Sequence, residues 1–144
     1  MKTSVSTLRK LQVLAILILI FADGTDVGQF SLSSFDTWSF GGIINVLLHA
    51  LAGFIFMVCG IQFFYAPRSL APRIWISALS VIGTVGNIVM IILGATNPDP
   101  NSVGVHSPGD WIVVIAIMAG VVLWFATLLV ERVQSVSVRR EAVA

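Results

Sequence analysis

Four long apolar stretches, each about the length of a membrane crossing, alternate with short polar segments along the chain. An α-helix rises about 1.5 Å per residue, so about 20 apolar residues cross a hydrocarbon core of roughly 30 Å. The clearest stretch, Phe40–Phe64, contains no formally charged side chain. The pattern predicts an all-α integral membrane bundle of four transmembrane helices, formed as a single domain over residues 1–144 with short loops. The predicted helices cover about residues 7–26, 40–64, 74–95 and 111–130.

The first apolar stretch, Leu11–Ala22, allows two interpretations because a basic tail precedes it. A basic start followed by a short apolar run is typical of a secretory signal peptide. Cleavage after Ala22, however, would place Ile20 at a position that prefers a small residue. We therefore favour a retained helix whose Arg9 and Lys10 reach the lipid head groups.

The charges separate by side of the predicted membrane. All 8 basic residues fall in the two terminal segments or between the second and third helices: Lys2, Arg9, Lys10, Arg68, Arg73, Arg132, Arg139 and Arg140. Every aspartate falls on the other side, either at the far end of the first predicted helix (Asp23 and Asp26) or in the other two connections (Asp36, Asp99 and Asp110). Because cytoplasmic loops carry an excess of Lys and Arg, both termini are predicted to be cytoplasmic, in the cell (plasma) membrane.

The composition agrees with this class, since 57% of the residues are hydrophobic and 10% are charged. Soluble domains carry about 25% charged residues. The few basic residues are not clustered with exposed aromatics, so we expect no nucleic-acid partner. The single Cys59 excludes an internal disulfide and a CxxC redox pair. The expected partners are the lipid bilayer and either further copies of this chain or another membrane protein.

Small and polar residues form a stripe on the second predicted helix: Gly42, Asn45, His49, Gly53 and Gly60. A polar group facing hydrocarbon without a partner is costly, so Asn45 and His49 are predicted to face the bundle interior. A second line follows the third helix, with Ser77, Ser80, Thr84 and Asn87. Small residues four apart let helices approach closely, and we assign helix packing to Gly53, Gly60, Ser80, Ala116 and Gly120.

These polar residues allow a structural and a functional interpretation. In the first, Asn45, His49 and Asn87 are mutual hydrogen-bond partners that fix the helix register. In the second, His49 is the centre of a substrate or proton path, because ionisable groups inside a membrane often mark functional sites. The candidate path consists of Asn45, His49, Thr84 and Asn87.

The polar connections offer only weak signals for metals or cofactors. Asp23 and Asp26 could collect cations, but such residues more often end a helix in water. The run Asn97-x-Asp99-x-Asn101 resembles the start of a calcium loop, yet it lacks the required Gly and the closing Glu. A haem held by two histidines of one chain is disfavoured, because His106 lies in a predicted loop. We assign no metal site and no catalytic residue, and the cofactor stays open.

Length and span count are similar to those of the small multidrug transporters, but their membrane-embedded Glu has no counterpart in residues 12–22. We claim membership of no family. Three functions remain. The favoured one is a non-enzymatic accessory or self-associating subunit of a membrane complex. The alternatives are a small-molecule or ion transporter or channel with a polar path around His49, and a cofactor-binding redox subunit.

Overall fold

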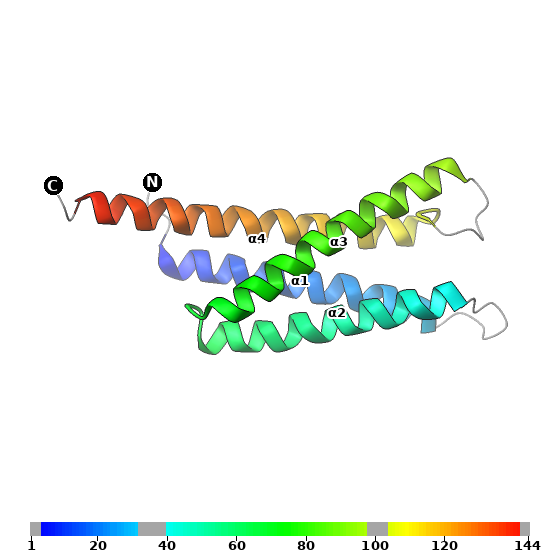
Figure 1. The fold of residues 1–144 in the computed structure, drawn as a ribbon, viewed down its shortest axis with the longest axis horizontal. Helices are drawn as coiled ribbons and strands as arrows, with labels where there is room; N and C mark the ends of the chain where they lie inside the picture. Colours follow the sequence, from blue (N-terminus) through cyan, green and yellow to red (C-terminus); the bar gives the residue numbers. More distant parts are fainter. Residues whose placement is uncertain (1–3, 32–39, 98–103, 142–144) are drawn as a thin grey trace.

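The computed structural model describes residues 4–31, 40–97 and 104–141, which form four α-helices (Figure 1). They are α1 (Val5–Ser31), α2 (Phe40–Tyr65), α3 (Leu70–Thr96) and α4 (Pro108–Glu141). Each is long and apolar enough to cross a membrane, which confirms the prediction of four such helices. The start of α1, the end of α4 and the α2–α3 connection lie together, and we call this the basic end (Figure 1). The opposite end is called the far end.

Helix α1 is the centre of the bundle, because it packs extensively against both α2 and α4. Glycines on the two neighbours allow this close approach. A Cβ atom on Gly60 of α2 would lie 2.9 Å from Cγ2 of Ile16, and one on Gly120 of α4 would lie 2.9 Å from Cγ of Leu19. The apolar segment Leu11–Ala22 therefore supplies much of the core. Whether it is retained in the mature protein stays a prediction.

Helix α3 crosses the other helices obliquely, and its contacts are with α2 and α4 (Figure 1). It is joined to α4 through Trp124, whose side chain is completely buried. The indole Nε1–H of Trp124 donates a hydrogen bond to Oγ of Ser77 over 3.0 Å, and its ring meets Phe63 edge to face. A buried indole needs such a polar partner.

Three helix ends differ from the sequence prediction by four residues or more. Helix α1 continues past Asp26 to Ser31, and α4 continues through the polar tail to Glu141. Hydropathy indicates where a helix leaves the apolar region. It does not indicate where the helix ends, because polar residues can also adopt the helical conformation. Helix α3 begins at Leu70 with Pro72 in its first turn, where a proline is tolerated because the missing N–H would have no partner inside the helix.

The start of α4 is closed by reciprocal hydrogen bonds. The backbone N–H of Ser107 donates to Oδ2 of Asp110 over 2.7 Å, and the N–H of Asp110 donates to Oγ of Ser107 over 3.1 Å. This is a capping box in Ser107-Pro108-Gly109-Asp110, with Pro108 at the first helical position. The sequence prediction places these four residues in the connection before the helix.

Some sequence expectations concern positions outside the described part. They are the calcium-like run Asn97-x-Asp99-x-Asn101 beyond Asn97, the polar segment at 32–39, and the side chains of Asp26, Asn45, Arg139 and Arg140.

Candidate functional site

A carboxylate and an imidazole meet between α1 and α2. Nδ1 of His49 lies 2.8 Å from Oδ1 of Asp23. The Asp23 side chain is 7% exposed and that of His49 is 27% exposed. An ionisable residue buried in a membrane bundle is costly unless it is paired, so this contact compensates for the burial of Asp23.

The small-residue stripe on α2 makes room for this pair. Gly53 lies one turn after His49, and a Cβ atom there would lie only 3.3 Å from Cβ of Asp23. The missing side chain allows the backbones of α1 and α2 to approach at the depth of the carboxylate. His49 and Gly53, four residues apart, thus act on the same face of α2.

A cavity of about 370 Å³ adjoins the pair and lies between α3 and the helices α1, α2 and α4. Asp23, His49, Ser80 and Asn87 are polar residues of its wall. The rest of the wall is apolar or glycine: Leu19, Ala52, Phe56, Leu79, Ile82, Gly83, Gly86, Val89, Met90 and Ile117. A mostly apolar wall with a few convergent polar groups is typical of small-molecule sites.

Ser80 is the unusual member of this wall. Its Oγ is buried and has no hydrogen-bond partner among the described residues. A buried hydroxyl without a partner carries a desolvation cost. The wall of the cavity therefore contains a hydroxyl whose hydrogen-bonding capacity is not met by the described residues.

The predicted path residues are only partly brought together. His49 and Asn87 both line the cavity. The Asn87 amide donates to the Gly83 carbonyl over 2.8 Å, and the Thr84 hydroxyl donates to the Ser80 carbonyl over 2.8 Å. Thr84 is not part of the cavity wall. The Asn45 side chain is outside the described part.

The packing residues also have clear positions. Gly53, Gly60 and Gly120 lie where another helix comes close. Ser80 is buried, and Ala116 packs against the core as a partly buried residue.

The position of Asp23 differs from the prediction, which places this residue at the end of a helix in water. It lies within α1, 5% exposed, on the buried side of the helix. The signal was available in the spacing. Gln12, Ile16, Leu19 and Asp23 follow one another at intervals of three or four and are all buried. The carboxylate therefore continues a helix face that begins near the basic end.

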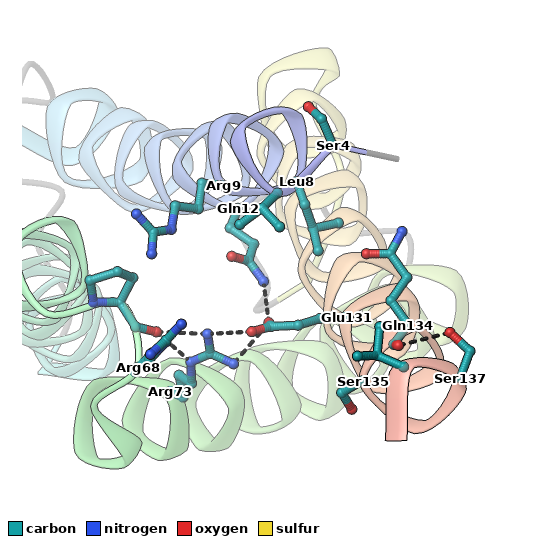
Figure 2. A pocket seen from close by; sticks show the side chains of 13 residues that line it. Ser4, Leu8, Arg9, Gln12, Arg68, Arg73, Glu131, Gln134, Ser135 and Ser137 are labelled. Atoms are coloured by element: carbon teal, nitrogen blue, oxygen red, sulfur yellow. Dashed lines mark hydrogen bonds and ion pairs between the residues drawn. The ribbon is translucent and has the colours of Figure 1, made fainter. Parts of the chain in front are cut away.

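A second polar cluster lies at the basic end. Nη1 and Nη2 of Arg73 each donate to one oxygen of Glu131 over 2.9 Å, and Gln12 also donates to this carboxylate over 3.1 Å. Nε and Nη2 of Arg73 further donate to the Pro67 carbonyl (Figure 2). This network joins α1, α3, α4 and the α2–α3 connection, and its two-pronged geometry needs an arginine.

The described residues contain no group of three His, Cys, Asp or Glu side chains arranged to hold a metal ion. His106 lies just before α4, and its backbone N–H donates to Oδ2 of Asp110 over 3.0 Å. Comparison of the chain with protein-family models, with curated proteins and with solved structures finds no match.

Proposed function

We propose that this small multi-pass membrane protein binds a small lipophilic amine next to the Asp23–His49 pair and carries it across the membrane in exchange for protons. The observation that supports this most directly is a buried carboxylate–imidazole pair at the wall of a largely apolar cavity. Ionisable residues inside membrane segments mark substrate and proton pathways.

The chemistry of the cavity favours a cation with an apolar body. In the empty site the Asp23 carboxylate and the His49 ring compensate each other. A bound ammonium would compete with the imidazole for the carboxylate. The Ser80 hydroxyl offers a further hydrogen bond, and Phe56 and Leu79 provide contact area for the apolar part.

The test uses ethidium, an aromatic cation with amino donors, as a fluorescent probe. Protein in proteoliposomes should take up ethidium under an imposed pH gradient. Asp23→Asn and His49→Gln should each abolish this uptake while the helix content, measured by circular dichroism, stays unchanged. Thr96→Val is the matched control, because Thr96 is exposed and bonded only within its own helix. No uptake by the wild type, or uptake retained in both site variants, would refute the proposal.

A second candidate, the accessory or self-associating subunit, is supported by α3. Of the residues in the most apolar stretch of α3, 11% are buried by the described part of the chain, compared with 39% for α4. Gly86 lines the cavity and is exposed at its open side, and a Cβ atom there would meet nothing within 4 Å. An open glycine on a poorly covered helix is the kind of surface on which another membrane helix packs.

This candidate has its own experiment. Gly86→Leu should leave the fold intact and dissociate a homo-oligomer or a co-purified membrane partner, as measured by mass photometry after mild detergent extraction. Gly24→Leu is the control, since Gly24 on α1 also has open space around its Cα. A monomeric wild type without a partner would contradict the self-associating or accessory role.

For the location we propose the plasma membrane, with the basic end in the cytoplasm. The orientation is supported by the charge distribution, because the basic side chains Arg9, Lys10, Arg68, Arg73 and Arg132 all line cavities or grooves at this end.

A further inference from the structure

Two cavities adjoin each other at the basic end. The first, of about 590 Å³, lies between α1, α4 and the α2–α3 connection and is shown in Figure 2. The second, of about 810 Å³, lies between α1 and α2. Both are lined by Val5, Arg9 and Pro67, so the two cavities adjoin along these three residues.

The first cavity carries an excess of positive charge. Arg9, Arg68 and Arg73 line it together with a single carboxylate, that of Glu131. Arg73 already holds this carboxylate with two hydrogen bonds (Figure 2). Arg9 and Arg68 are exposed and form no ion pair within the described part of the chain, although Arg9 is close enough to attract the Glu131 carboxylate through space. This part of the surface suits an anionic group.

The second cavity is apolar below its cationic rim. Arg9 and Lys10 lie near the start of α1. The wall continues toward the interior of the membrane with Val13, Leu14, Leu17, Phe63 and Phe64. Leu17 is 56% exposed and Phe64 is 68% exposed, so this wall is not covered by the chain itself. Its shape suits a hydrocarbon chain that runs along α1.

We propose that the joined cavities bind one anionic phospholipid, with its phosphate at Arg9 and Arg68 and one acyl chain along Leu14 and Leu17. Basic pockets between helices at a membrane surface bind anionic head groups in this way. A soluble phosphate would leave the apolar groove unfilled. A zwitterionic lipid would gain little from the excess positive charge.

The experiment is native mass spectrometry of the full chain in a neutral detergent, with dioleoyl phosphatidylglycerol and dioleoyl phosphatidylcholine in equal amounts. The protein should retain one phosphatidylglycerol in preference to phosphatidylcholine. Arg68→Gln and Arg9→Gln should each weaken this retention about fivefold, which corresponds to one basic residue near a membrane surface. Arg68→Lys should keep most of it, because the charge is preserved.

Arg132→Gln is the matched control. It removes the same charge from the same end of the molecule, but Arg132 lines neither of the two joined cavities. It lines a groove on α4 and a groove between α3 and α4 that meets the first cavity only at Arg73, Glu131 and Ser135. Leu17→Trp tests the apolar part, since a bulkier side chain should displace the acyl chain and weaken retention without changing the charge. Equal retention of the two lipids, an equal loss in Arg132→Gln, or equally tight binding of glycerol 3-phosphate would each overturn the proposal.

Discussion

The hydrogen bond between Asp23 and His49 predicts a measurable coupling between two helices. We consider a double-mutant cycle of Asp23→Ala, His49→Ala and the double variant. Each single change removes one partner of a contact of 2.8 Å between side chains that are 7% and 27% exposed. The double change removes both. The cycle therefore isolates the energy of the pair from other effects of each truncation.

The magnitude follows from the environment of the pair. Hydrogen bonds between membrane helices contribute about 0.6 kcal/mol on average and up to about 1.7 kcal/mol. A bond to a charged group is roughly twice as strong as a neutral one. The partial exposure of His49 reduces this gain. We therefore expect a coupling of about 1–2 kcal/mol, or a factor of about 5–30 in the folding equilibrium.

The assay is unfolding in mixed micelles with increasing dodecyl sulfate, followed by tryptophan fluorescence. Trp124 is a suitable reporter, because its ring is completely buried between helices. A control cycle of Asp23→Ala with Gln12→Ala should be additive, since Gln12 contacts Glu131 near the basic end. A coupling between Asp23 and His49 below about 0.5 kcal/mol, the usual scatter for independent sites, would refute the reasoning.

Three further predictions concern packing, the basic-end network and the start of α4. Gly120→Leu should lower the unfolding free energy by about 1–3 kcal/mol in the same assay, because its Cβ would crowd Leu19, and a normal stability would contradict the packing of α4 on α1. Arg73→Lys should lower the unfolding free energy by up to about 1 kcal/mol, because a lysine cannot bind both carboxylate oxygens of the partly exposed Glu131. An unchanged unfolding midpoint would count against the network. Ser107→Ala should lower the unfolding free energy by about 1 kcal/mol and speed amide hydrogen exchange in the first turn of α4, whereas Ser107→Asp should do neither. Equal exchange rates in the two variants would exclude the cap.

Much of the fold could be predicted because lipid imposes strict requirements on length and polarity. Four apolar stretches separated by polar segments indicate four helices, and the structure contains them. The far limit of α1 and the end of α4 could not be found in this way. Charged and polar residues mark the edge of the hydrocarbon region, whereas backbone hydrogen bonds continue in the polar run up to Glu141.

Only part of the candidate site could be predicted from the sequence. His49 and Asn87 were expected in the interior from their position within uncharged stretches, and both line the cavity. Hydropathy does not identify Asp23 as an interior residue, because a charge marks the boundary of a predicted span. The helical spacing from Gln12 through Leu19 to Asp23 shows the buried face. The identity of the partner across the helix interface depends on the rotation of α1 against α2, which local patterns do not determine.

The depth of Asp23 is the most direct test of the account. In a Cys59→Ala background, intact membranes carrying Asp23→Cys or Asn97→Cys are treated with a membrane-impermeant maleimide. Asn97 is the exposed C-cap of α3 at the far end, so its cysteine should react at once. The cysteine at position 23 should react only after denaturation, because the bundle covers this position. Equal labelling of the two cysteines in intact membranes would show that Asp23 lies in water and would contradict the account.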